Sequence, residues 1–369
     1  MSSTLTLHGV PDVLTSEQMA TTGEYLKNLQ RTNGQIPWFE GGHCDPWNHV
    51  EVAMALTICG HVDSARAAYA WLESEQLGDG SWFNYYIGDR VKDARLDTNV
   101  CAYVATGLYH YVLATGDVDF GAAMWPMVQR AISFVLRWQL DDGTIRWSLD
   151  AQGRPEPYAL LTGSSSIFHS LRCAVALSER LGYGQPEWEL AIGRLGHAVS
   201  HHPGAFAPKN EFAMDWYYPI FSGALREARG ERRIADGAER HVMDGLGVRC
   251  VSTNDWVTAA ETAECVLALD ALGLTTQALE LFRCTNLHRR DDGAYWTGIA
   301  YPDRVTFPHR EVTSYTAAAV LLAADALTSS SDAAGLFRHD ELPTPLDLSE
   351  PGCPLLTASS GDDRAFAPQ

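Results

Sequence analysis

Acidic residues suited to acid–base chemistry stand at the entrances of several apolar segments of this chain. Five are candidate catalytic residues: Asp45, Glu51, Asp97, Asp215 and Glu261. A carboxylate that caps a helix receives backbone N–H groups, which lower its pKa and keep it ionised. A carboxyl group inside an apolar helix has a raised pKa and can donate a proton. We therefore expect Glu51 and Glu261 to act as acids, and the three aspartates as ionised partners.

Aromatic and polar side chains accompany these acids in the same loops and helix starts. Capping a helix needs no tryptophan, so this company favours a binding cavity over a purely structural role. Glu264 follows Glu261 on the same segment and is a substitute for it. The candidate substrate-binding residues are Trp38, Trp47, His49, Tyr86, Asn99, Trp216, Tyr217, Trp256, Trp296 and Glu311.

Other kinds of chemistry leave no pattern in the chain. The histidines and cysteines never adopt metal-ligand spacing on one segment, and no glycine-rich phosphate loop is present. The three consecutive serines at 164–166 have no matching His and Asp that would indicate a Ser-His-Asp catalytic triad. We therefore expect no metal and no cofactor. A structural role remains open for each acid, since Asp45 precedes a proline as an N-cap does and Thr258-x-x-Glu261 has the form of a capping box.

A turn glycine followed by a tryptophan recurs four times and predicts a repeat architecture. Each copy begins with Gln or a charged residue and places Asn or Asp near the glycine, which supplies the positive φ that ends a helix. The copies span residues 30–38, 75–82, 139–147 and 289–296.

Two kinds of helix alternate along the chain. Segments with one apolar stripe, typical of helices with one solvated face, are 16–29, 63–75, 122–139, 187–199, 233–246 and 275–285. Segments apolar on every side, typical of buried helices, are 46–59, 98–114, 165–180, 216–227, 256–272 and 312–327. The pattern predicts an all-α (α/α)6 toroid of six outer and six inner helices, with an open solenoid as the alternative.

In such a ring all six inner helices start at the same rim. Asp45, Asp97, Asp215 and Glu261 are then expected to face one central cavity, which Trp38, Trp216 and Trp296 also line. The predicted organisation is a lead-in at residues 1–15, the toroid at 16–328 and a C-terminal tail at 329–369. That tail lacks helical periodicity and is expected to be partly disordered.

Composition excludes several partners. A net charge of −19 argues against nucleic acid and anionic membranes, and no apolar run of 18 residues is present to span a membrane. The eight cysteines are scattered and never form Cys-x-x-Cys, which favours reduced thiols in a cytoplasmic protein. The expected partner is a small-molecule substrate, while the oligomeric state stays open.

The turns and alternating layers resemble the terpenoid cyclase and protein prenyltransferase β-subunit superfamily, whose members are α/α toroids with aromatic-lined cavities. Over roughly residues 16–327 the chain is similar to actinobacterial proteins labelled "prenyltransferase". The resemblance implies an enzyme that performs acid-assisted chemistry on a prenyl-derived or similar small metabolite, with Asp97 or Glu261 donating the proton. The π faces expected to stabilise positive charge are those of Trp47, Trp216, Trp256 and Trp296.

The chain departs from this superfamily at its catalytic motifs. Cyclases carry Asp-x-Asp-Asp or Asp-x-Asp-Thr, but Arg95 stands where the first aspartate belongs before Asp97. The zinc enzymes carry Asp-x-Cys, and here Asp292 is followed by Gly and Ala, which makes a zinc site and protein prenylation unexpected.

Two alternatives therefore stay open. The first is a carbohydrate-active (α/α)6 enzyme similar to glycoside hydrolases, with paired rim carboxylates and tryptophans that stack on sugars. Residues 36–42 and 45–51 have the composition of such sugar subsites. The second alternative is a non-catalytic binding toroid.

Overall fold

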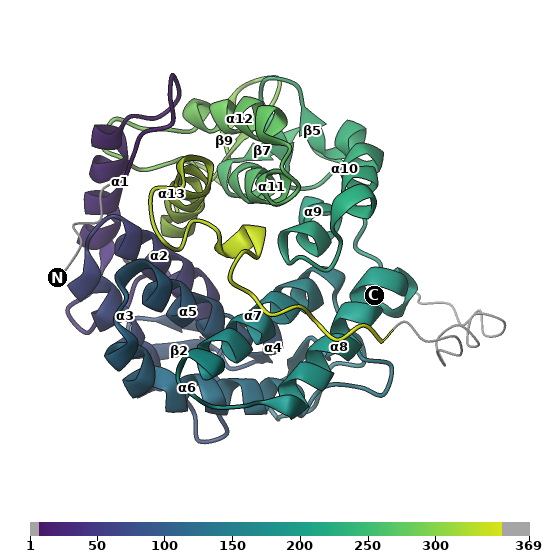
Figure 1. Cartoon of the computed structure of the whole chain (residues 1–369). Helices are drawn as coiled ribbons and strands as arrows, with labels where there is room; N and C mark the ends of the chain where they lie inside the picture. Colours follow the sequence, from purple (N-terminus) through teal and green to yellow (C-terminus); the bar gives the residue numbers. More distant parts are fainter. Residues whose placement is uncertain (1–6, 349–369) are drawn as a thin grey trace.

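The computed structural model describes residues 7–348 and confirms the (α/α)6 toroid, as two concentric layers of helices (Figure 1). The outer layer contains α1 (Ser16–Leu29), α3 (Val62–Glu75), α6 (Val118–Leu136), α8 (Pro186–His201), α10 (Glu227–His241) and α12 (Thr275–Arg283). The inner layer contains α2 (Pro46–Ile58), α4 (Thr98–Ala102), α5 (Val104–Thr115), α7 (Leu161–Arg180), α9 (Ala213–Phe221), α11 (Ala259–Ala271) and α13 (Ser314–Thr328).

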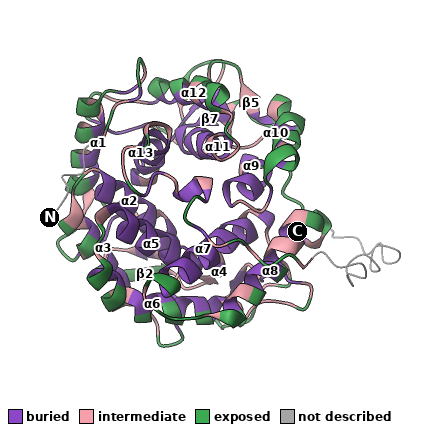
Figure 2. Cartoon of the chain, viewed as in Figure 1, coloured by how far each residue is buried: buried purple, intermediate pink, exposed green. Residues whose placement is uncertain are grey.

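Burial follows the two sequence patterns. Every residue of α2 except Asn48 is buried, whereas α3 buries only one stripe that includes Tyr69 and Leu72 (Figure 2). The apolar surface of the inner helices is thus covered on all sides, and the outer helices keep a solvated face. Within residues 7–348 no helix is long and apolar enough to cross a membrane, and no three His, Cys, Asp or Glu side chains are grouped to hold a metal ion.

The repeated turn glycines press the turns against neighbouring outer helices. Gly34, Gly80, Gly143 and Gly293 have φ of 93°, 97°, 85° and 86°. A Cβ on Gly34 would lie 2.2 Å from the carbonyl oxygen of Ala67 in α3, so a side chain has no room there. The other three turns meet α6, α8 and α1 in the same way, and the contact with α1 helps close the ring.

The glutamine of each of the first three turns forms a hydrogen bond with the same neighbouring outer helix that its turn glycine meets. Gln30 Nε2 donates to the carbonyl oxygen of Ser64 in α3 at 2.8 Å. Gln76 and Gln139 make equivalent bonds at 2.9 Å to α6 and α8. Each amide also bonds its own turn, so the glutamine, the glycine and the turn together attach one hairpin to the next. The repeat is therefore explained by ring assembly.

Short strands, which the helical pattern did not predict, lie near the starts of inner helices. Two small sheets pair β1 (Tyr85–Ile87) with β2 (Arg90–Asp93), and β3 (Leu96–Asp97) with β4 (Ser148–Leu149). A five-stranded antiparallel sheet contains β5 (Val242–Met243), β6 (Gly247–Arg249), β7 (Trp256–Thr258), β8 (Gly298–Ala300) and β9 (Val305–Thr306).

This sheet corrects two predicted helix boundaries. Residues 256–258 are extended, and α11 begins at Ala259 instead of at 256. Residues 242–243 are also extended, so α10 ends earlier than the predicted 233–246. Valine, threonine and tryptophan favour strands once a partner strand is available, and β6 between the two segments pairs with both of them.

The predicted tail is folded up to residue 348. A short 3-10 helix, η3 (Leu336–Arg338), is the yellow turn in the middle of the ring in Figure 1. Phe337 is buried, with ring centroids 4.5 Å from Phe221 and 5.1 Å from His169. Arg338 is paired with Asp270 near the end of α11 at 2.9 Å. This segment closes the end of the ring where the inner helices terminate, whereas residues 349–369 lie outside the described residues.

Candidate active site

Asp45 caps α2 at the opposite, open rim. Its Oδ1 accepts the Asn48 N–H at 2.9 Å, and its Oδ2 accepts the Trp38 indole N–H and the Asn48 amide, each at 2.6 Å. These bonds favour the ionised form, but burial outweighs them and raises the pKa of Asp45. The expectation that capping lowers this pKa is wrong, because the side chain is buried and loses its hydration.

Asp97 repeats this arrangement at the start of α4. Its Oδ1 accepts the N–H groups of Asn99 and Val100 at 2.9 and 3.1 Å, and its Oδ2 accepts the Trp147 indole N–H at 2.6 Å. Burial raises the pKa of Asp97 to about 6, and the charge of Asp45 adds to the rise. The expected lowering is wrong here as well. A carboxyl group with this pKa can exchange a proton near neutral pH.

Glu261 lies in the first turn of α11 and is partly exposed. The Thr258 hydroxyl donates to its carboxylate, so the predicted capping box is replaced by a bond between the two side chains. The Cys250 thiol lies beside Glu261. Burial raises the pKa of this thiol, and the negative charge of Glu261 raises it further. No lysine or arginine of the described residues forms an ion pair with Glu261.

Aromatic rings connect these acids along the rim. Burial raises the pKa of Tyr85 to about 12, and the charges of Asp45 and Asp97 add to it. Burial likewise raises the pKa of Tyr315, and the charges of Glu261 and Asp45 add to that rise. Both tyrosines pack on Trp38, at centroid distances of 6.0 and 4.9 Å. Asp97, Asp45 and Glu261 therefore follow one another on a single aromatic arc.

Two further carboxyl groups lie deeper in the ring. Glu51 on α2 is 3% exposed and Glu264 on α11 is 4% exposed. Glu264 accepts the hydroxyls of Tyr217 and Tyr218, the latter at 2.7 Å, and burial raises its pKa to about 8. Burial and the Glu264 charge raise the pKa of Glu51 well above its usual range, in the predicted direction. Both carboxyl groups therefore hold their protons more tightly than an exposed glutamate does.

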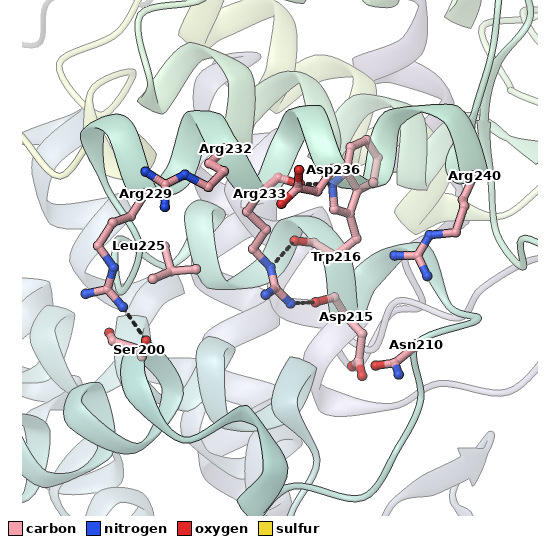
Figure 3. A pocket seen from close by; sticks show the side chains of 11 residues that line it. Ser200, Asn210, Asp215, Trp216, Leu225, Arg229, Arg232, Arg233, Asp236 and Arg240 are labelled. Atoms are coloured by element: carbon pink, nitrogen blue, oxygen red, sulfur yellow. Dashed lines mark hydrogen bonds between the residues drawn. The ribbon is translucent and has the colours of Figure 1, made fainter.

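Asp215 is separate from this arc. Its Oδ1 accepts the N–H and the hydroxyl of Thr162, at 3.2 and 2.5 Å. Burial raises its pKa, and the charges that act on it are those of Arg233 and Glu211. It lines a groove of about 420 Å³ between α8, α9 and α10, together with Trp216 and several arginines (Figure 3). The structure thus places Asp215 and Trp216 at this groove.

His49 and Tyr86, both predicted to bind substrate, are interior. Each is at most 2% exposed. Backbone groups take both ring nitrogens of His49: Nδ1 accepts the Ile36 N–H at 3.1 Å, and Nε2 donates to the Ala68 carbonyl at 3.0 Å. Tyr86 packs edge-on against Trp71. Neither side chain has surface to offer a ligand, so we leave both out of the site.

The remaining candidates lie at different depths. Trp47 is buried, stacked at 4.3 Å on Tyr103, and Tyr217 is taken up by its bond to Glu264. Trp38, Asn99, Trp256, Trp296 and Glu311 are partly exposed. The side-chain oxygen of Asn99 has no hydrogen-bond partner within residues 7–348. This unpaired acceptor is buried and belongs to a residue next to Asp97 in the chain.

Three rim residues escaped the prediction. His43 lies 4.1 Å from the Trp38 ring and 4.8 Å from Tyr85, by centroids, and Trp147 holds Asp97. Only one of the two neighbouring tyrosines of β1 can reach the rim, because Tyr86 is buried. The exposed neighbour is Tyr85. His43 had a signal as well, since it is two residues from Asp45.

One characterised protein resembles the chain over nearly its whole length. The MMP endo-(1,4)-3-O-methyl-alpha-D-mannosidase of Mycolicibacterium hassiacum is 50% identical over 339 residues, which cover 92% of this chain and 94% of that protein. The chain belongs to the family of this mannosidase. No family model matches it. Membership of the mannosidase family confirms the expectation of an enzyme, and it supports the carbohydrate-active alternative.

Solved structures show the same architecture. A structure titled "Glycosidase Wild Type" has a TM-score of 0.68 at 13% identity, covering 85% of this chain and 97% of that one. A D-mannose isomerase has a TM-score of 0.66 at 10% identity, covering 85% and 96%. At these identities the likeness establishes the fold alone, and it agrees with the toroid.

The mannosidase relationship overturns the resemblance to terpenoid cyclases and prenyltransferases. The expected chemistry on a prenyl-derived metabolite is wrong with it. The Gln-to-Gly-to-Trp turns that suggested it clamp each hairpin to the next, a task that any such ring has whatever its substrate. They are therefore specific for the toroid and carry no information on the reaction.

Proposed function

We propose that this protein is a glycoside hydrolase that cleaves α-1,4 linkages within chains of 3-O-methyl-mannose. The close similarity to a mannosidase named for that linkage and sugar supports the substrate. The observation that carries the proposal is the pair of partly exposed carboxyl groups, Asp97 and Glu261, on one aromatic rim. Glycoside hydrolysis requires two such groups, one to protonate the leaving oxygen and one to activate or act as the nucleophile.

Asp97 is our proposed general acid. A carboxyl group with a pKa of about 6 still holds its proton in a useful fraction of molecules near neutral pH. That proton goes to the glycosidic oxygen as the bond to the anomeric carbon breaks. The Trp147 indole N–H and two backbone N–H groups then stabilise the carboxylate that forms by donating hydrogen bonds to it. These donors are already in place, so they need not reorganise during the reaction.

Glu261 is our proposed base or nucleophile. The Thr258 hydroxyl orients it, and no cation neutralises it within the described residues. As a base it takes a proton from the water that attacks the anomeric carbon; as a nucleophile it bonds to that carbon first, and water then releases the sugar. Either course leaves a reducing sugar on one product and restores both carboxyl groups.

The other acids support this pair. Asp45 lies between them on the arc, and its negative charge helps Asp97 to keep its proton. Glu51 and Glu264 are buried, so we assign them to the wall beneath the site. Trp38 and Tyr85 are partly exposed and offer their rings to a sugar.

The test is hydrolysis of linear α-1,4-linked 3-O-methyl-mannose oligosaccharides by the purified protein, followed by mass spectrometry. Internal cleavage predicts shorter oligosaccharides as the first products. Glu261→Gln is expected to lose at least about a hundredfold in kcat/KM. Asp215→Asn, a change of the same type outside the arc, is expected to stay close to the unchanged protein. No products from the unchanged protein would reject the proposed activity.

A further inference from the structure

The five-stranded sheet at the start of α11 exposes one apolar face. Residues directly opposite each other on paired strands project to the same side of a sheet. Trp256 pairs with Ala300, and Ala300 pairs with Val305, so these three side chains form one row. Val305 is 57% exposed, while Trp256 and Ala300 are partly exposed. This row faces away from the core.

The opposite face of the same strands is covered. Its row contains Val257, Ile299 and Thr306, and the first two are 0% and 8% exposed. The sheet already has a buried apolar face, so the exposed row is not needed to hold the sheet to the ring. Exposed apolar side chains that gather on one surface mark binding sites.

Phe307 extends the exposed face toward the helix. Its N–H donates to the Gly298 carbonyl, and its side chain is 54% exposed. The Trp256 indole crosses Gly298 so closely that a Cβ there would lie 2.1 Å from its Nε1. That nitrogen donates to the Phe307 carbonyl at 3.1 Å, and the two rings meet edge-on at 5.4 Å. Trp256 is thus held in one orientation.

This face continues to the proposed nucleophile. Thr258 is two residues after Trp256 on β7, so it projects to the same side. Its hydroxyl bonds Glu261. Thr258 itself is buried, so the exposed row ends at Trp256 and Phe307, and the partly exposed Glu261 follows in the first turn of α11. A chain bound at Glu261 can continue directly onto the apolar row.

We propose that Trp256, Val305 and Phe307 form an apolar subsite that selects sugars carrying O-methyl groups. This rests on the proposed function and specifies how the same site distinguishes its substrate. A methyl ether has no hydroxyl donor to satisfy, and its transfer from water to an apolar surface is favourable. An unmethylated sugar places a hydroxyl against the same surface without a partner, which is unfavourable.

The experiment uses two linear α-1,4-mannose oligosaccharides of equal length, one 3-O-methylated and one not. The measured quantity is the ratio of kcat/KM for the methylated over the unmethylated substrate. The double variant Val305→Ser and Phe307→Ser is expected to lower this ratio about tenfold, through the methylated substrate alone. Leu190→Ser removes an apolar side chain that is 41% exposed on α8, and it is expected to leave the ratio unchanged.

The outcomes separate the subsite from the proposed function. An unchanged ratio in the double variant, with both substrates still cleaved, would overturn the subsite and leave the hydrolase intact. If the unchanged protein cleaves neither substrate, the proposed function fails. Binding of both oligosaccharides to Glu261→Gln, measured by calorimetry, then decides the subsite. If the double substitution weakens the binding of the methylated oligosaccharide alone, the subsite is supported. If Glu261→Gln binds both oligosaccharides with equal affinity, the subsite is rejected.

Discussion

The two ends of the ring bury titratable groups for different purposes. At the closed end Arg172 is 1% exposed and His339 is 5% exposed, and burial lowers the pKa of Arg172 to about 10. Backbone carbonyls of Ser222 and Pro343 accept bonds from Arg172, and Phe337 fills the space beside these residues. At the open rim, Asp97 and Glu261 remain partly exposed beside aromatic rings. A shifted pKa therefore marks a site only where a ligand can also reach the group.

The largest effect on folding is expected at the closed end. Phe337→Ala removes a buried ring that stacks on Phe221, and it should lower the free energy of unfolding by about 3–5 kcal/mol. The rim is distant, so the pH profile of kcat/KM in the folded protein should not move. Denaturant unfolding and steady-state kinetics measure both. A shifted pH profile would show that the two ends are not independent.

A smaller, pH-dependent effect is expected beneath the rim. The folded pKa of Glu264 is about 8, above its ordinary 4.5, so the folded chain keeps a proton that the unfolded chain loses in between. The stability that this proton contributes is complete below about 4.5 and is lost as the pH rises through about 8.

Glu264→Gln carries no such proton. Its free energy of unfolding, relative to the unchanged protein, should rise by more than about 1 kcal/mol across that pH range. Glu73→Gln, at an exposed position of α3, is the control and should give a flat difference. A flat difference for Glu264→Gln as well would show that Glu264 is ionised in the folded protein.

Local patterns were sufficient to predict most of the fold. Helical periodicity placed α1 at its observed bounds and α2 within one residue, because each face of a helix reports its own burial. The strand at 256–258 was missed because a short apolar run fits a helix as well as a strand, and its pairing with β6 and β8 is not visible in the periodicity. The packing of Phe337 into the ring was missed because its partners, His169 on α7 and Phe221 on α9, are distant in sequence.

The candidate site was predicted in part. The residue types at the rim entrances indicated Asp45, Asp97 and Glu261, but the pKa values of the two aspartates depend on burial, which the sequence does not state. Capping bonds predicted low values for the aspartates, whereas desolvation raises them. Asp215 has the same local signature, yet its neighbours are arginines of α10. This groove is built by packing of the outer helices α8 and α10 on α9, which the local sequence does not reveal.

The most direct test of the account compares two leaving groups in the proposed acid and nucleophile variants. The substrates are a 3-O-methyl-α-mannoside oligosaccharide and the same sugar bearing a dinitrophenyl group, which departs without protonation. Asp97→Asn is expected to lose about a hundredfold or more on the first and little on the second, whereas Glu261→Gln loses activity on both. In the unchanged protein, kcat/KM for the oligosaccharide should fall as the pH rises past about 6, where Asp97 loses its proton. Equal losses of Asp97→Asn on both substrates, with no fall above that pH, would contradict the assignment of Asp97 as the acid.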